Sequence, residues 1–99
     1  MTTPDEVIQH EGNDRHGAFF IERDGRRIGE LSYHLAGDTA IVGHTWVDPQ
    51  VRGGGEARKL VAAVVDWARR EKRHISPACS YVRAVMDRKP SDYADIRKS

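Results

Sequence analysis

Arg52-Gly53-Gly54-Gly55-Glu56-Ala57-Arg58-Lys59 marks the place where the sequence changes from a strand pattern to a helix pattern. Before it, apolar and polar residues alternate, as they do in half-buried strands. After it, apolar residues recur at spacings of three and four over residues 57–68, which predicts an amphipathic helix. The sequence therefore predicts an α/β domain whose antiparallel strands precede this junction and whose one long helix follows it.

The residues before the junction are predicted to form an antiparallel meander. Asp24-Gly25 is a strong signal for a two-residue hairpin turn, and Pro49 ends the last strand because proline cannot donate to a ladder. The predicted strands are residues 7–8, 18–22, 27–35 and 39–47. Strict alternation puts these side chains together on one face of their strands: Ile28, Glu30, Ser32 and His34 in the third, and Val42, His44 and Trp46 in the fourth.

The residues after the helix are predicted to return to the sheet. A short strand at residues 74–79 is expected to run parallel to strand 39–47, because a helix of crossover length joins them. A short C-terminal helix over residues 81–88 is ended by Pro90, and residues 93–96 form a packing tail. A chain of 99 residues can bury one core, so residues 1–99 are predicted to be a single domain.

Charge is distributed unevenly along the chain. Residues 1–51 carry a net charge of −5 and residues 52–99 a net charge of +6. A basic half suits a phosphate-rich ligand, and nucleic acid is the rival partner. The basic residues are scattered among acidic ones and no nucleic-acid-binding motif is visible, so no nucleic-acid partner is expected.

The sequence also predicts where the protein resides. The N-terminus lacks the basic and apolar regions of a signal peptide, and the longest apolar run, Leu60–Val65, is too short to span a membrane. The single cysteine excludes an internal disulfide. A cytoplasmic protein with no membrane partner is expected.

The glycine junction predicts an anion site. Glycines at a helix start allow backbone N–H groups to converge on an anion. The usual capping residues are missing, and the cations Arg58 and Lys59 oppose the helix dipole unless an anion is bound. A flexible surface turn is the alternative interpretation. The nucleotide P-loop and the dinucleotide-binding motif do not match.

The segment Val47–Ala57 resembles the cofactor signature of the GNAT acetyltransferase superfamily, in which Arg or Gln is followed by two residues, Gly, one residue, and Gly or Ala. Arg52, Gly55 and Ala57 occupy those positions. The resemblance extends over residues 7–96 to a short, single-domain branch of the superfamily (YjdJ-type proteins). The segments that carry it are Phe20 with Asp24-Gly25, His44–Pro49, Pro77–Val82 and Lys89–Tyr93. It implies a reduced GNAT-like fold.

The resemblance also implies a cofactor and a set of site residues. The cofactor is acetyl-CoA, or CoA, with its diphosphate held by the loop amides and its pantetheine arm paired with the preceding strand. The expected cofactor-binding residues are Trp46, Val47, Arg52, Gly53, Gly54, Gly55, Glu56, Ala57, Arg58 and Lys59. Glu56 departs from the family pattern, which has an apolar residue there, and adds a negative charge beside the diphosphate site.

Cys79 and His44 are the candidate catalytic residues. Cys79 is expected next to the cofactor strand, where it either lines the site or accepts the acetyl group as a nucleophile. His44 is a candidate general base, although a structural histidine is an equal alternative, and Tyr81 and Glu30 are weaker candidates for acid and base. His10, His16 and His74 have no ligand spacing with Cys79, so no metal site is expected.

The sequence therefore predicts an N-acetyltransferase that uses acetyl-CoA and an unidentified amine acceptor, as a monomer or weak dimer. A non-catalytic CoA-binding sensor or interaction module on the same fold is the alternative, since so short a chain offers little to enclose an acceptor. RNA binding by the basic half is a third hypothesis.

Overall fold

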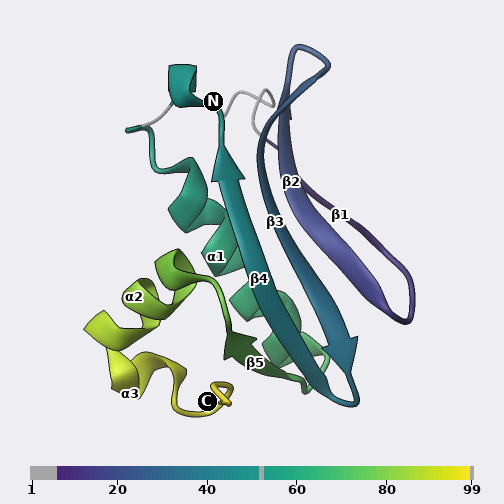
Figure 1. Cartoon of the computed structure of the whole chain (residues 1–99), viewed down its shortest axis with the longest axis vertical. Helices are drawn as coiled ribbons and strands as arrows, with labels where there is room; N and C mark the ends of the chain where they lie inside the picture. The colour runs from purple at the N-terminus through teal and green to yellow at the C-terminus, as the bar shows by residue number, and fades with distance from the viewer. Residues whose placement is uncertain (1–6, 52, 99) are drawn as a thin grey trace.

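The computed structural model describes residues 7–51 and 53–98, which form one mixed sheet with helices packed against it (Figure 1). The strands are β1 (Val7–Gly12), β2 (His16–Arg23), β3 (Arg26–Ala36), β4 (Thr39–Val47) and β5 (His74–Pro77). The helices are α1 (Glu56–Arg70), α2 (Ser80–Arg88) and α3 (Pro90–Tyr93), with a 3₁₀ turn η1 at Pro49–Val51. The sheet is five-stranded in the order β1-β2-β3-β4-β5.

The strand pairing confirms the predicted α/β topology. Strands β1 to β4 form an antiparallel meander, and β5 pairs with β4 in parallel after the crossover through α1. The hairpin between β2 and β3 turns at Asp24 and Gly25, whose φ angles of 54° and 76° are both positive. Two successive positive φ angles are what a type I′ turn requires.

The main differences from the predicted element boundaries lie in β1, in β5 and after α2. Strand β1 has six residues rather than two, because its polar middle gives no strand signal until it pairs with β2. Strand β5 ends at Pro77, so Cys79 lies beyond it and directly precedes α2. Pro90 ends α2 as expected and also begins α3, since the first helical turn does not need the N–H that proline lacks.

Two β-bulges change which side chains face the core. Ile21 pairs with Gly29 and Glu22 with Arg27, so Ile28 is an extra residue in β3 and is fully buried. The prediction that Ile28 shares a face with Glu30 is therefore wrong, because an inserted residue reverses the alternation.

The second bulge lies in β4. Ser32 pairs with His44 and Tyr33 with Val42, which leaves Gly43 as the extra residue. Val42 is fully buried whereas His44 is exposed. The predicted common face of Val42 and His44 is wrong for the same reason, while His44 and Trp46 do share a face.

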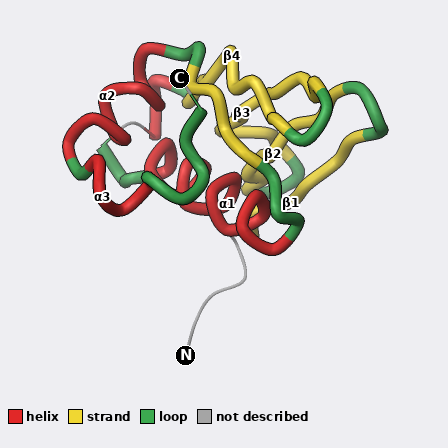
Figure 2. The backbone as a smooth tube through the Cα atoms, turned by 90° about the horizontal axis from the view of Figure 1, so that it is seen from below, coloured by secondary structure: helices red, strands yellow, loops and turns green. Residues whose placement is uncertain are grey.

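The core lies between one face of the sheet and α1. Figure 2 shows α1 beneath the sheet, with α2 and α3 to one side of it. The largest fully buried side chains come from β2 to β5, α1 and α2: Ile21, Ile28, Leu31, Val42, Leu60, Val61, Val64, Ile75, Val82 and Met86. Trp67, expected to pack rather than bind a ligand, is buried in α1 against His10, Phe19 and Tyr33.

The sheet is left open in two places. Strand β5 pairs with β4 only from Thr39 to Val42, so residues 43–47 of β4 have no partner strand on that side in the described part of the chain. The face opposite α1 carries the exposed side chains of His34, His44 and Trp46. The unpaired edge of β4 adjoins the glycine junction.

Candidate functional site

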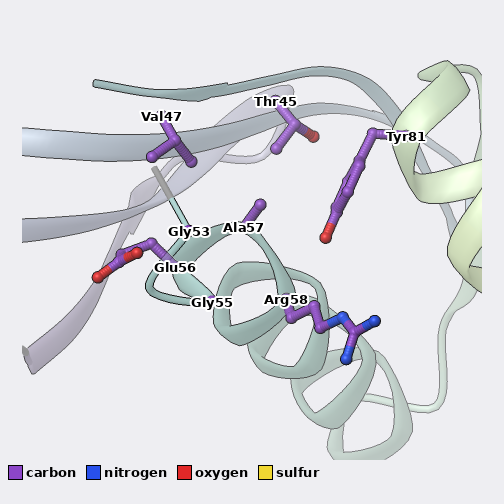
Figure 3. A pocket seen from close by; sticks show the side chains of 8 residues that line it. All are labelled: Thr45, Val47, Gly53, Gly55, Glu56, Ala57, Arg58 and Tyr81. Carbon is purple, nitrogen blue, oxygen red and sulfur yellow. The ribbon is translucent and has the colours of Figure 1, made fainter. Parts of the chain in front are cut away.

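A pocket of about 550 Å³ lies where β4, the glycine loop and the starts of α1 and α2 meet (Figure 3). Its lining residues are Thr45, Val47, Gly53, Gly55, Glu56, Ala57, Arg58 and Tyr81. The pocket occupies the notch left where β5 ends and β4 continues. Segments that are far apart in the sequence are therefore brought together around the junction that the sequence singled out.

The glycine loop leaves the start of α1 without a side-chain cap. Gly53 and Gly55 have φ angles of 96° and 82°, in the left-handed region that favours glycine. Gly55 is the N-cap residue, its carbonyl accepts the first intrahelical bond from Lys59 N–H at 3.1 Å, and no side chain in the described residues caps the helix. The first N–H groups of α1 are therefore available to an anion.

Gly54 has a different explanation. A Cβ atom built on Gly54 would lie 2.7 Å from Oε1 of Glu56, closer than two such atoms can approach. Glycine at this position thus leaves room for the carboxylate of Glu56, the first residue of α1. The contact with Glu56 explains the glycine at position 54 without a bound ligand.

Glu56 is buried rather than free beside the pocket. Its side chain is only 5% exposed, and its Oε2 lies 3.4 Å from Nη2 of Arg23 at the end of β2. Its Oε1 has no hydrogen-bond partner in the described residues. In Figure 3 the carboxylate points away from the end of the pocket that Tyr81 lines. Arg23, which the sequence analysis did not single out, therefore offsets part of the Glu56 charge.

The remaining predicted cofactor residues separate into three groups. Val47, Ala57 and Arg58 line the pocket. Lys59 lines a different depression, between β1, α1 and α3. Trp46 lies on the opposite face of β4 because alternate residues of a strand face opposite ways. Arg52, the first residue of the signature, lies outside the described residues.

Cys79 lies at the edge of the pocket. It is the N-cap residue of α2, it is half-buried, and its Sγ donates to Oγ1 of Thr45 at 3.5 Å. Its backbone N–H donates to the carbonyl of Val42 at 2.8 Å, which fixes it where β4 and β5 diverge. The predicted proximity of Cys79 to strand 39–47 is confirmed, since Cys79 contacts Thr45 and Val42 of β4.

The surroundings of Cys79 favour its thiolate. Burial raises the pKa of Cys79, but its hydrogen bonds with Thr45 and with the backbone of Val82 and Tyr81 lower it, and the result is a pKa below the ordinary value. A thiol with a lowered pKa is a better nucleophile at neutral pH. Nothing in the sequence indicated that Thr45 is a site residue, apart from its position two residues before Val47.

His44 does not reach the pocket. It lies on the exposed face of β4, opposite Ser32 of β3, whereas the pocket is lined by Thr45 and Val47 on the other face. His44 and Cys79 therefore lie on different sides of β4 and do not contact each other.

Two further features are absent from the described residues. No group of three or more His, Cys, Asp or Glu side chains among them is arranged to hold a metal ion. None of the helices found in residues 7–51 and 53–98 has both the length and the apolar character to cross a membrane.

Comparison with solved structures finds the same fold in other proteins. A GCN5-like protein from Staphylococcus aureus, solved by NMR in solution, is 24% identical over 98% of this chain and 92% of its own, with a TM-score of 0.74. The ribosomal-protein-S18-alanine N-acetyltransferase of Escherichia coli is 18% identical over 65% of this chain and 42% of its own, with a TM-score of 0.60. An aminoglycoside N-acetyltransferase in complex with CoA is 19% identical over 88% of this chain and 62% of its own, with a TM-score of 0.56.

Comparison at the level of sequence gives the family. No curated protein sequence matches the chain significantly. The model of the family described as GCN5-related N-acetyl-transferase matches residues 18–96, which include all of β3, β4, the glycine loop, α1 and α2. The chain therefore belongs to the GCN5-related N-acetyltransferase (GNAT) family.

Proposed function

We propose that this protein binds acetyl-CoA in the pocket beside β4 and transfers the acetyl group to an amine. The observation that carries the proposal is that an uncapped helix start and the unpaired edge of a strand open into the same pocket. The first suits a diphosphate and the second suits an amide-bearing arm, and CoA carries both. The GNAT fold explains why the uncapped helix start and the unpaired strand edge lie side by side.

The features of the pocket at its loop end support the proposal that it binds the diphosphate. The N–H groups at the start of α1 are uncapped, and Gly53 and Gly55 carry no side chain that would block an approaching ligand. Arg58 lines the same pocket and supplies a positive charge. Arg52 is proposed as a second cation on the basis of the signature alone.

The strand end of the pocket supports the pantetheine arm. Residues 43–47 of β4 have no β5 partner in the described structure, so their backbone groups on that side can pair with the amides of an extended ligand, as an added strand would. Thr45 and Val47 line the pocket along this edge. When bound, acetyl-CoA supplies an activated thioester, and the chain's own task is to hold and orient it.

Cys79 is proposed to act at the thioester. In the simpler role, Cys79 and Thr45 line the site and the acceptor amine attacks the thioester directly. In the covalent role, the Cys79 thiolate attacks the carbonyl carbon, the bond from that carbon to the CoA sulfur breaks, and CoA leaves as a thiolate. The amine then attacks the acetylated Cys79, releases its thiolate and loses a proton. The lowered pKa of Cys79 favours the second role.

Binding and turnover are tested separately. We expect isothermal titration to show CoA and acetyl-CoA binding, and Gly55→Ala to weaken it because Gly55 has a positive φ at the helix start. Asp14→Ala, in the turn between β1 and β2, is a control that should bind normally. Free thiol release is then followed with polyamines, peptides and amine drugs as acceptors. Tight CoA binding with no turnover on any of them would identify the non-catalytic sensor instead.

The role of Cys79 is tested by intact mass. The covalent role predicts an acetyl adduct after incubation with acetyl-CoA alone, and no adduct on Cys79→Ala. Retention of full activity by Cys79→Ala would leave only the lining role. The acceptor, the monomeric or weakly dimeric state and the cytoplasmic location stay predictions.

A further inference from the structure

A buried acidic residue stands at each end of the glycine loop. Asp48 precedes η1 and the loop, Glu56 begins α1 after the loop, and the two residues are 8% and 4% exposed. Among the described residues they are the acidic residues that are buried. Since Asp and Glu are almost never buried without a partner, each of the two requires a cation nearby.

Both cations come from one hairpin of the sheet. Nη1 of Arg26 donates to Oδ2 of Asp48 at 2.7 Å, and Nη2 of Arg23 donates to Oε2 of Glu56 at 3.4 Å. Arg23 ends β2 and Arg26 begins β3, so they flank the turn at Asp24-Gly25. Figure 1 shows this turn and the glycine loop at the same end of the sheet. The hairpin therefore contacts the chain just before the loop and just after it.

The two arginines also depend on the two acids. Arg23 and Arg26 are directly paired across the hairpin, and like charges directly opposite each other on neighbouring strands are destabilising. Asp48 and Glu56 place a negative charge beside each arginine. The ion pairs therefore stabilise the hairpin end and the two ends of the loop together.

The glycine loop itself has few other contacts that fix its backbone. In the described residues, its backbone hydrogen bonds lie at its ends: Val51 N–H donates to Asp48 O at 3.0 Å, and Gly55 O accepts from Lys59 N–H at 3.1 Å. A Cβ atom built on Gly53 or Gly55 would meet nothing within 4 Å. The position of the loop is therefore set mainly at its two ends.

Asp48 links the hairpin with the start of the loop through three hydrogen bonds. Its backbone N–H donates to Ile28 O at 2.8 Å, its Oδ1 accepts from the Gln50 N–H at 2.9 Å, and its Oδ2 accepts from Arg26. The bond from Gln50 and the contact with Arg26 keep the pKa of Asp48 below its ordinary value, although desolvation opposes them. Asp48 is therefore charged at neutral pH and connects η1 with the hairpin.

The conformation of the loop matters because its N–H groups hold an anion only when they converge on it. A loop that is already held in the bound conformation loses less conformational entropy when the ligand binds. We propose that Arg23 and Arg26 are positioning residues, which act through Glu56 and Asp48 to hold the glycine loop in the conformation that binds the diphosphate of CoA. Neither arginine lines the pocket, and their role toward CoA rests on the proposed function.

The first test compares CoA with pantetheine, which lacks the diphosphate, by isothermal titration. Arg26→Gln should weaken CoA binding about threefold, as the loss of a partly exposed ion pair does, and should leave pantetheine binding unchanged. Arg26→Lys keeps a cation near Asp48 and should retain most of the CoA affinity. Arg27→Gln is the matched control, because it removes the same charge from the next residue, whose ion-pair partners are Glu30 and Glu11. It should bind CoA as the wild type does.

Combined variants test whether each ion pair acts as a unit. Asp48→Asn keeps an oxygen that can accept from Gln50 and removes the charge beside Arg26, so Arg26→Gln should weaken CoA binding no further in its presence. Arg23→Gln should weaken CoA binding because it leaves the charge of Glu56 less compensated. It should have no effect in Glu56→Ile, because a buried apolar side chain at that position packs without a cation.

The mobility of the loop gives a readout that requires no ligand. NMR relaxation of backbone ¹⁵N nuclei reports motion on the picosecond to nanosecond timescale. The order parameters of Gly53, Gly54 and Gly55 should be lower in Arg26→Gln than in the wild type, and unchanged in Arg27→Gln.

The outcomes separate the positioning role from general damage and from the proposed function. Unchanged CoA binding by Arg26→Gln, an equal loss in Arg27→Gln, or an equal loss of CoA and pantetheine binding would each overturn the positioning role. If the wild type binds no CoA, the proposed function fails, and inorganic pyrophosphate becomes the probe. Saturable pyrophosphate shifts of the Gly53 and Gly55 amide signals that weaken in Arg26→Gln would keep the positioning role, and their absence would overturn it as well.

Discussion

Glu56 places a carboxylate at the start of a helix whose N–H groups are proposed to hold an anion. Its burial and its ion pair with Arg23 reduce that conflict, but one oxygen has no partner in the described residues. We predict that Glu56→Ile binds CoA at least as tightly as the wild type, because it removes a negative charge near the diphosphate. Calorimetry at low and high salt measures the affinity of both proteins for CoA. Distinctly weaker binding would place the diphosphate elsewhere, and Glu56→Gln controls for the change of shape.

Gly54 and Glu56 should be coupled in stability. The Cβ of Gly54→Ala would lie 2.7 Å from Oε1 and 2.8 Å from Oε2 of Glu56. We expect Gly54→Ala to lower the free energy of unfolding by about 1 kcal/mol, as overpacking in a tight site does, and to cost much less when Glu56 is already alanine. Urea unfolding of the two single variants and the double variant measures the coupling. Equal costs in both backgrounds would mean that the backbone, and not the carboxylate, requires glycine there.

Thr45 is expected to set the reactivity of Cys79. Its hydroxyl can donate to the thiolate and so helps to keep the pKa of Cys79 below its ordinary value. Thr45→Val keeps the shape of the side chain and removes this hydrogen bond, so the pKa should rise and the thiolate fraction at neutral pH should fall. The pH dependence of iodoacetamide alkylation measures the pKa. Thr39→Val, on the same strand away from Cys79, should leave the alkylation profile unchanged.

At the scale of the elements, the sequence predicted what depends on local pattern. Asp24-Gly25 predicted its hairpin, and the spacing of Leu60, Val61 and Val64 predicted the buried face of α1. The two bulges could not be predicted in the same way, since a bulge is a property of a strand pair and not of one strand. Gly43 was a usable sign, because an isolated glycine inside a strand often marks a bulge.

The candidate site, too, could be predicted only where it depends on a local residue pattern. The loop from Gly53 to Ala57 was found because its glycines and its place before a helix are local features. The Gly43 bulge decides that His44 faces away from the pocket, and the end of β5 at Pro77 decides that Cys79 approaches Thr45. Arg23 is the partner of Glu56 across 33 positions of sequence, which no local pattern encodes.

The attachment of β1 to the rest of the fold is expected to depend on pH. His10 of β1 stacks on Phe19 at 4.1 Å and hydrogen-bonds to Tyr33 beside Trp67. Burial, together with the charge of Arg70, lowers the pKa of His10 from its ordinary 6.5, although Glu71 opposes the shift.

The sign of this effect follows from linkage. The unfolded chain binds a proton at His10 more readily than the folded chain does, so the free energy of unfolding should fall as the pH drops below about 6.5. His10→Phe keeps a ring for stacking and removes the titration, so it should flatten this part of the profile. Urea unfolding between about pH 7 and pH 5 measures it. His34→Gln, at an exposed position of β3, should leave the slope unchanged.

At the scale of the whole molecule, one layer of helix on one sheet leaves two accessible surfaces on either side of β4. The pocket with Thr45 and Val47 opens toward α1 and α2, and the face with Trp46 and His44 is left uncovered. The edge of β4 beyond Val42, which has no partner strand in the described residues, separates the pocket from this face.

A ligand that spans β4, the glycine loop and α2 should stabilise the fold as a whole. A domain of 99 residues is expected to unfold in one cooperative step, and a ligand present at about 100 times its Kd adds about 2.7 kcal/mol to the free energy of unfolding. For a domain of this size, that corresponds to a rise in Tm of about 10 °C or more. Scanning calorimetry with CoA measures this rise. Pantetheine, which lacks the diphosphate, should give a much smaller rise at the same concentration, because only the β4 edge would hold it. An equal effect of pantetheine and CoA would mean that the helix start contributes nothing, and would remove the diphosphate from the loop.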